Sequence, residues 1–286
     1  METSLCLRKE TGIVNEDAHS ESMGTSAADV MLEVQNGVGI LELNRPKAYN
    51  AFDLPMVQRL ADELVALAGR EDVRGLIVTG HGKAFCAGGD LRWIAGYNGR
   101  YGAAFHELAA RFHQAILEMR RMPKPVIAAL NGLAAGGGFS LALACDFRIM
   151  DRSAVLRQAY TSNGLSLDGG GTFTLPRIVG LARAMEVVTF DAPIDAAKAL
   201  EWGLVTEVVE QGRSVARALE VMEDILSRSS SSFAASKQLL LESFGNPFEL
   251  QLEREREMLA RCGDHPNGHE GVGAFLEKRK PRFQPV

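Results

Sequence analysis

The chain lacks any long hydrophobic run, and it has few cysteines and few aromatic residues for its length of 286 residues. No apolar stretch approaches the roughly 18–20 residues that cross a bilayer, which argues against a membrane protein. The four cysteines are scattered, without a CxxC motif or a Cys/His cluster, so the sequence indicates neither a disulfide framework nor a metal site. We therefore expect no metal and a reducing, cytoplasmic setting.

An excess of positive charge is also missing. The chain has 31 lysine and arginine residues against 36 aspartate and glutamate residues, which gives a formal charge of −5. A surface for nucleic acid or for a membrane needs clustered positive charge. The composition therefore predicts a protein that binds neither nucleic acid nor membrane.

The first 29 residues differ in composition from the rest. They are polar and of mixed charge, with no apolar segment for a secretion signal and too many acidic residues for a transit peptide. We expect residues 1–29 to be a poorly ordered extension. Residues 30–225 are expected to form the core, and residues 226–286 a helical C-terminal region.

Strand and helix patterns alternate through the core, which favours an α/β fold. Apolar runs on both sides of Asn36-Gly37 predict a hairpin. The periodicity of residues 53–68 and 101–121 predicts two helices, and Pro123 ends the second. Further expectations are strands at 75–79, 126–130 and 147–150, helices at 139–145 and 250–261, and a turn at the four serines 229–232.

Two glycine-rich segments stand where a strand gives way to a helix. The first is GKAFCAGGDL, residues 82–91; the second is KPVIAALNGLAAGGGFSLALACD, residues 124–146, which contains Gly136-Gly137-Gly138. Glycine leaves backbone N–H groups open to a ligand, and a helix N-terminus adds unpaired donors and partial positive charge. Two such donors aimed at one point form an oxyanion hole. The alternative is that both segments are simple chain reversals.

Six ordered segments between about residues 30 and 283 resemble the crotonase superfamily, the enoyl-CoA hydratase/isomerase group. Besides the two glycine segments, they are NRPKAYNAF (44–52), GLSLDGGGTFTLPRIVG (164–180), AKALEWGLVTEVV (197–209) and EGVGAFLEKRKPRF (270–283). The resemblance implies the crotonase fold, a spiral of ββα units with a helical trimerisation region. It also implies an acyl-CoA thioester substrate, an oxyanion hole made by the N–H groups of Gly89 and Gly137, and a homotrimer or dimer of trimers.

The chain departs from standard hydratases at the two positions where those enzymes have water-activating glutamates. The matching positions are Ser140 and, approximately, Tyr160. Serine and tyrosine are poor bases near pH 7, since the pKa of a phenol is about 10. The two-glutamate mechanism for adding water is therefore not expected here.

One carboxylate does stand in the matching loop. Asp168 precedes Gly169-Gly170-Gly171, and its surroundings resemble those of the ring-1,2-epoxyphenylacetyl-CoA isomerases, a group that also shifts double bonds from 3-enoyl-CoA to 2-enoyl-CoA. A single carboxylate suits such an isomerase, because it can remove a proton at one carbon and return it two carbons away. The alternative is that Asp168 only caps the following turn. Leu167 is a departure, since those isomerases usually have proline there.

The resemblance also implies contacts to coenzyme A, which is part of the substrate, so no separate cofactor is expected. Segments 47–48 and 87–91 match those along the pantetheine and under the thioester, and the C-terminal positions match residues that reach a neighbouring subunit's coenzyme A. The residues implied in binding are Lys47, Ala48, Ala87, Gly88, Asp90, Leu91, Gly136, Tyr160, Phe275 and Lys278.

The sequence thus predicts an enoyl-CoA double-bond isomerase of fatty-acid or aromatic-acid catabolism, with Asp168, Gly89 and Gly137 as catalytic groups. An enoyl-CoA hydratase that adds water to 2-enoyl-CoA through Asp168, alone or with Ser140, is the alternative within the same family. A non-catalytic crotonase-fold binding protein is the alternative of another class. His113, on the helix before Pro123, is interpreted as structural.

Overall fold

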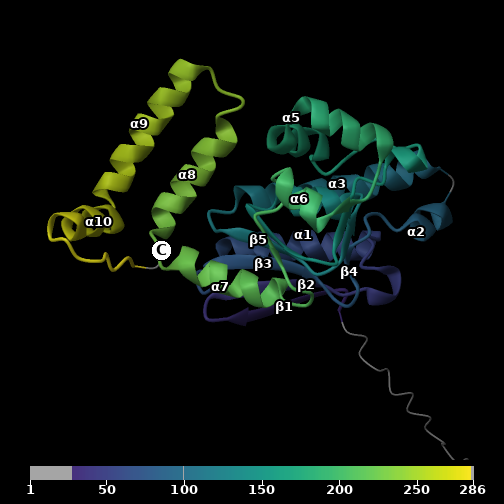
Figure 1. Cartoon of the computed structure of the whole chain (residues 1–286), viewed down its shortest axis with the longest axis horizontal. Coiled ribbons are helices and arrows are strands. Elements are labelled where there is room, and N and C mark those ends of the chain that lie inside the picture. The colour runs from purple at the N-terminus through teal and green to yellow at the C-terminus, as the bar shows by residue number, and fades with distance from the viewer. Residues whose placement is uncertain (1–27, 99, 285–286) are drawn as a thin grey trace, which may run out of the picture.

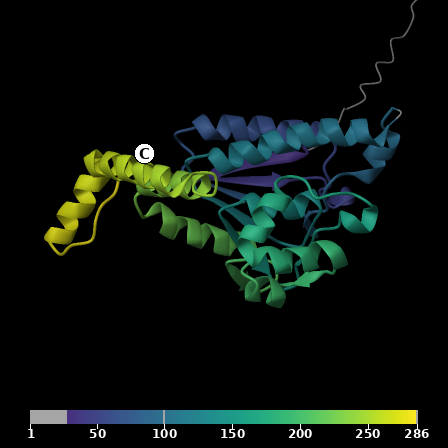
Figure 2. The ribbon, with the colours of Figure 1, turned by 90° about the horizontal axis from the view of Figure 1, so that it is seen from above.

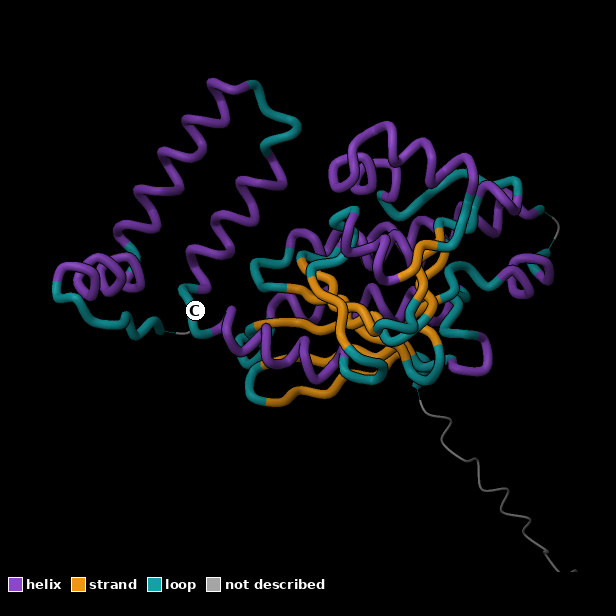
Figure 3. The backbone as a smooth tube through the Cα atoms, viewed as in Figure 1, coloured by secondary structure: helices purple, strands orange, loops and turns teal. Residues whose placement is uncertain are grey.

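A six-stranded sheet lies at the centre of the computed structural model, which describes residues 28–98 and 100–284 (Figure 3). Nearly all of the expected N-terminal extension, residues 1–29, lies outside the described residues. Neighbouring strands are parallel except in the β1–β2 hairpin. In spatial order the strands are β1 (Val30–Gln35), β2 (Val38–Leu43), β3 (Gly75–Gly80), β5 (Val126–Leu130), β7 (Phe147–Asp151) and β10 (Glu207–Val209).

A second sheet is built from short strands, of which β4, β6 and β8 each follow a strand of the first sheet and β9 follows α5. It has the order β4 (Ala84–Cys86), β6 (Leu133–Ala135), β8 (Val155–Arg157) and β9 (Ile194–Asp195). The succession β3-β4, β5-β6 and β7-β8, with helices after each pair, is a repeated ββα unit. The expected spiral of such units is therefore confirmed.

Helices cover both faces of the large sheet. On one face α1 and α3 pack against each other, as Figure 2 shows, and α7 covers the opposite face around Ile77 and Ile127. The helices are α1 (Leu54–Gly69), α2 (Leu91–Gly96), α3 (Tyr101–Arg121), α4 (Gly137–Ala144), α5 (Gly171–Phe190), α6 (Ala196–Glu201), α7 (Ser214–Leu226), α8 (Ser230–Glu242), α9 (Phe248–Asp264) and α10 (Pro266–Leu276), and two short 3-10 helices lie at Pro46–Ala48 and Thr161–Asn163.

Most of the predicted elements are present. Asn36 and Gly37 have φ angles of 53° and 80°, as the predicted hairpin turn requires. The predicted helix at 53–68 is α1, whose N-cap Asp53 accepts a hydrogen bond from the Met56 N–H at 3.0 Å. The turn expected at 229–232 is wrong: Ser229 is the N-cap of α8, because its Oγ accepts from the Ser232 N–H.

The last three helices form an arm, residues 230–276, that extends away from the sheets (Figure 1). The arm contributes no residue to the two buried apolar clusters of the described structure. It is fastened where Lys237 Nζ lies 2.8 Å from Asp146 Oδ2, and where the Arg177 guanidinium stacks on the Phe244 ring at 4.8 Å. None of the helices described is long and apolar enough to span a membrane.

Candidate active site

The first glycine segment leaves one backbone donor free at its turn. After β4 the chain pairs with Phe52, whose N–H donates to the Gly88 carbonyl and whose carbonyl accepts from the Asp90 N–H. This pairing uses the groups on both sides of Gly89, and the Gly89 N–H has no acceptor among the described residues. The Gly89 N–H is thus available to a ligand.

The triple glycine supplies the second donor. Gly136 has φ 52° and is the N-cap of α4, so Gly137 is the first residue of a helix that is buried along its whole length. The helix was expected from residue 139; it begins two residues earlier, at Gly137. The Gly137 N–H therefore belongs to the first turn, where helical N–H groups have no partner within the helix and carry partial positive charge.

Because Gly88 and Gly138 have no side chain, the two glycine segments can lie close together. Gly88 has φ 90°, and a Cβ on it would lie 2.9 Å from both the Ala135 carbonyl oxygen and the Gly137 nitrogen. A Cβ on Gly138 would lie 2.1 Å from the Cys86 carbonyl oxygen. Any side chain at these positions would force the turns apart, so glycine here serves a close approach of backbone to backbone.

Gly89 and Gly137 border one cavity of about 240 Å³. Its walls are mainly apolar, and a single carboxylate, that of Asp168, is among the lining residues. Those residues are Phe52, Gly89, Phe105, Leu108, Ala109, Phe112, Gly137, Tyr160, Leu165, Ser166 and Asp168. The structure thus brings the three predicted catalytic groups to one cavity.

Asp168 is held from several sides. The Tyr160 hydroxyl donates to Asp168 Oδ1, and the Ser140 hydroxyl donates to the Asp168 backbone carbonyl at 2.8 Å. His113 Nε2 accepts from the Gly169 N–H at 3.1 Å and lies 3.7 Å from Asp168 Oδ2. Burial, followed by the nearby Asp168 carboxylate, raises the pKa of the Tyr160 phenol, which therefore stays protonated near neutral pH.

Ser140 and Tyr160 thus have structural partners at the two positions where hydratases have glutamates. Ser140 is fully buried and uses its hydroxyl hydrogen on the Asp168 backbone. His113 supports the same loop through Gly169, in line with its structural interpretation. Leu167, which replaces a usual proline, packs against the apolar core beside this loop.

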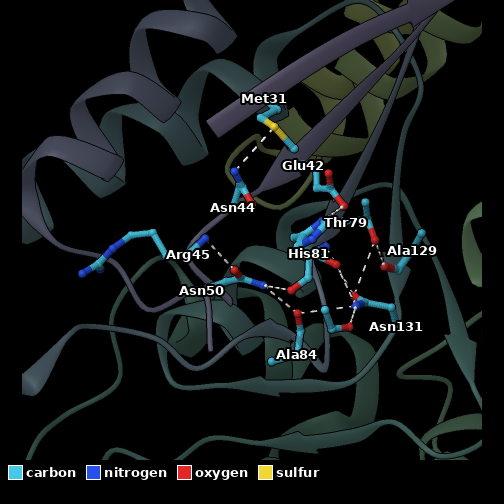
Figure 4. A network of polar contacts seen from close by, with 12 residues as sticks. Met31, Glu42, Asn44, Arg45, Asn50, Thr79, His81, Ala84, Ala129 and Asn131 are labelled. Carbon is cyan, nitrogen blue, oxygen red and sulfur yellow. Dashed lines mark hydrogen bonds and ion pairs between the residues drawn. The ribbon is translucent and has the colours of Figure 1, made fainter. Parts of the chain in front are cut away.

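A network of polar contacts holds the segment at residues 44–52 against residues 81–84, where the first glycine-rich segment begins (Figure 4). The Asn50 amide accepts from the Arg45 N–H and donates to the carbonyls of His81 and Ala84. Asn131 donates to the carbonyl of Gly80 at 2.7 Å. Asn50, fully buried at φ 57°, was not predicted from the sequence, because no local pattern distinguishes it from a surface asparagine.

Asp90 is fully engaged in structural contacts. Its Oδ1 accepts from the Arg92 and Trp93 N–H groups and caps α2, and its Oδ2 lies 3.0 Å from Arg45 Nη2. The same Arg45 nitrogen lies 3.0 Å from Asp53 Oδ2. This arrangement ties the start of α1 to the start of α2 and fixes the turn that presents Gly89.

The residues assigned to coenzyme A fall into two groups. The first group lies near the glycine segments. Lys47 and Ala48 are in the short 3-10 helix after β2, and the Ala87 N–H donates to the nearby Tyr49 carbonyl. Leu91 is half exposed, and Gly136 is the N-cap of α4. Phe275 lies at the end of the arm and Lys278 two residues after it, and neither lines the cavity within this chain. Phe275 is 82% exposed.

Comparison with known proteins places this site in a family. The model of the enoyl-CoA hydratase/isomerase family matches residues 33–285. The chain belongs to the enoyl-CoA hydratase/isomerase family. Its expected resemblance and its crotonase fold are confirmed, and as a member of the family it is an acyl-CoA enzyme.

The relatives differ in reaction. The 1,2-epoxyphenylacetyl-CoA isomerase of Escherichia coli K12 is 34% identical over 255 residues, covering 89% of this chain and 97% of the relative. A probable enoyl-CoA hydratase of Rhodobacter capsulatus is 36% identical over 259 residues, with the same coverages. The crystal structure of an enoyl-CoA hydratase from Polaromonas sp. JS666 has a TM-score of 0.85 at 34% identity and covers 89% of this chain and 99% of its own.

Proposed function

We propose that the protein is an enoyl-CoA double-bond isomerase that uses Asp168 as its acid and base. The observation that carries the proposal is the cavity itself. Within the described part of the chain, two backbone donors without an acceptor and one carboxylate border it, and its lining contains no second carboxylate. An allylic proton shift needs one group that takes a proton and gives it back.

The reaction follows from these positions. The thioester oxygen of a 3-enoyl-CoA accepts hydrogen bonds from the Gly89 and Gly137 N–H groups, which makes the protons on C2 more acidic. Asp168 removes a proton from C2; the electrons of that bond delocalise through the C3–C4 double bond as a dienolate whose oxygen the two donors stabilise. Asp168 then returns the proton to C4, which leaves the double bond between C2 and C3.

The walls of the cavity favour an apolar acyl group. Phe52, Phe105, Leu108 and Phe112 present rings and branched carbon chains, and Phe52 and Phe112 lie with their ring centroids 5.0 Å apart. Burial of each methylene of the substrate against such walls contributes about 0.8 kcal/mol. A hydrocarbon or aromatic acyl chain is therefore the expected substrate class.

A hydratase is the second candidate, because relatives such as the Rhodobacter capsulatus protein are named as hydratases. It would have to activate water with Asp168 alone. Ser140 is fully buried, donates its hydroxyl hydrogen to the Asp168 backbone and is not among the residues that line the cavity, so it does not reach a water molecule there.

The deciding experiment supplies 3-enoyl-CoA and 2-enoyl-CoA separately in heavy water and follows products by mass spectrometry. Double-bond migration should fall by about 10²–10⁴-fold in Asp168→Asn, the range that general acid–base catalysis supplies. Asp195→Asn is the matched control, since Asp195 only caps α6 through the Lys198 N–H. Addition of water to 2-enoyl-CoA by wild type, with little migration, would replace the isomerase by a hydratase.

We also propose that the protein assembles as a trimer or a dimer of trimers through the arm. Large apolar side chains of the arm are exposed, among them Leu259, Phe275 and Leu276 at 76%, 82% and 74%. A hollow of about 820 Å³ separates the arm from the end of α3 and is lined in part by Leu117, Leu241 and Met258. Apolar side chains exposed to this degree are typical of a protein interface.

A further inference from the structure

The backbone conformation immediately before Tyr160 is unusual and sets the direction of the Tyr160 side chain. Ala159, immediately before it, has φ 52°, a left-handed conformation that is disfavoured for a residue with a Cβ. The Ala159 N–H donates to Asp191 Oδ1 at 2.7 Å, and Arg157 pairs with the same carboxylate at 3.2 Å. The surrounding contacts therefore maintain a strained residue at this point.

A second contact fixes Tyr160 itself. Its N–H donates to Gln158 Oε1 at 3.0 Å, and Gln158 is completely buried. The Tyr160 ring is only 9% exposed, and its hydroxyl meets Asp168 Oδ1. Strained backbone kept in place by buried partners is typical of sites where one side-chain direction matters.

The two oxygens of Asp168 are consequently different. Oδ1 accepts from the phenol, whereas Oδ2 has no hydrogen-bond donor among the described residues and lies 3.7 Å from His113 Nε2. That nitrogen already accepts from the Gly169 N–H, so in the neutral ring it has no hydrogen to give to Oδ2. The lone pairs of Oδ2 are free for a substrate proton.

We propose that Tyr160 is the positioning residue of the acid/base: its phenol holds Oδ1 of Asp168 and leaves Oδ2 to exchange protons with the acyl chain. The proposal rests on the proposed function. Tyr160 keeps its own proton throughout and acts only as a donor. Its hydrogen bond restricts the carboxyl group to one orientation, and it stabilises the charged carboxylate over the neutral acid.

The variant Tyr160→Phe tests this role, because it keeps the ring and removes only the hydroxyl. We expect kcat for double-bond migration to fall about tenfold to a hundredfold, in line with the loss of one hydrogen bond to a charged group, while KM changes little. The acidic limb of the kcat/KM profile should move to higher pH, since the carboxylate has lost a hydrogen-bond donor. A tyrosine that only forms part of the wall would change KM or the melting temperature and leave the acidic limb in place.

A measurement without substrate separates this proposal from the proposed function. The ¹³C resonance of the Asp168 carboxyl, assigned by its loss in Asp168→Asn, is followed against pH in wild type and in Tyr160→Phe. The midpoint should rise in the variant. Tyr97→Phe is the matched control, since its hydroxyl donates to Glu107 Oε2 at 2.5 Å and does not reach Asp168.

The titratable groups that face Asp168 in the described residues are Tyr160 and His113. Histidines can change charge in the range of the assay, so the comparison is repeated in the His113→Gln background, where the shift caused by Tyr160→Phe should persist. An unchanged midpoint in Tyr160→Phe would overturn the positioning role. If the midpoint differs between wild type and Tyr160→Phe but the wild type does not isomerise 3-enoyl-CoA, the isomerase proposal is wrong and the positioning role of Tyr160 stands.

Discussion

At the scale of single residues, Gly88 is the position where the fold and the chemistry depend on one missing side chain. A Cβ on Gly88 would meet the Ala135 oxygen and the Gly137 nitrogen at 2.9 Å. We expect Gly88→Ala to push the two turns apart and to lower kcat/KM by about 10²–10³-fold, the effect of losing one oxyanion donor. Steady-state kinetics with an enoyl-CoA substrate measure this loss.

Gly203→Ala is the control for Gly88→Ala. Gly203 also has a positive φ, 71°, but a Cβ on it would have no atom within 4 Å. Both variants therefore share the backbone strain of alanine in the left-handed region, and only Gly88→Ala has the close contact. Equal losses of activity in the two variants would contradict the view that Gly88 aligns the oxyanion donors.

At the scale of elements, the segment after α10 is held at two points. The Asn267 amide exchanges hydrogen bonds with the Gln284 backbone at 2.9 and 2.8 Å, and Glu270 holds the residues before it. Glu270 accepts from Arg279 Nη1 at 2.7 Å and from the Arg282 N–H at 2.6 Å. Hydrogen bonds from Arg279, then from the Arg282 backbone, lower the pKa of Glu270 to about 2. Because the folded pKa lies below the usual value of about 4.5, the stabilisation is complete above pH 4.5 and is lost as the pH falls toward 2.

We therefore expect Glu270→Gln to loosen the residues between α10 and Arg282 at neutral pH, while Asn267 still holds Gln284. Cleavage by trypsin after Arg279 and Arg282 should become about two- to fivefold faster, the range that exposed ion pairs supply. Glu277→Gln is the control, since Glu277 contacts only Arg279 Nε, at 2.6 Å, and its side chain is more exposed. Faster cleavage in Glu277→Gln than in Glu270→Gln would contradict the assignment of Glu270 as the main contact.

The elements also differ in how far the sequence predicts them. The bounds predicted for α3 and β5 are those of the structure. The long apolar periodicity of α3 and the apolar run of β5, which follows two prolines, are both local signals. The strands β4, β6, β8 and β9 have only two or three residues each, too short for any periodicity, and they were not predicted. Their pairing arises from tertiary contacts.

The active site likewise has some features that local sequence patterns predict and others that depend on tertiary contacts. The glycine donors and Asp168 lie in motifs that the sequence displays, and all three line the cavity. The phenol–carboxylate contact of Tyr160 and Asp168 depends on the left-handed Ala159 and on Asp191, far along the chain, so no local pattern predicts it. Phe112 is buried in the core, yet it also lines the cavity, because the same face of α3 serves both purposes.

At the scale of the whole molecule, the proposed trimer depends on the arm. We expect sedimentation velocity at micromolar concentration to give three or six copies of the 31.0 kDa chain. Replacing Phe275 and Leu276 with glutamate should shift the protein toward smaller species, because charge would have to be buried at the interface. Val65→Glu, on the exposed face of α1, is the control and should leave the assembly unchanged. A wild-type monomer would contradict the role of the arm.

The two proposed oxyanion donors, the N–H groups of Gly89 and Gly137, belong to the main chain. No exchange of the side chains that line the cavity removes the N–H of Gly89 or Gly137, since each is part of the chain itself. The acid and the walls, in contrast, are side chains, and a single codon replaces any of them. Divergence from this scaffold can therefore alter the reaction and the acyl group separately while enolate stabilisation is inherited unchanged.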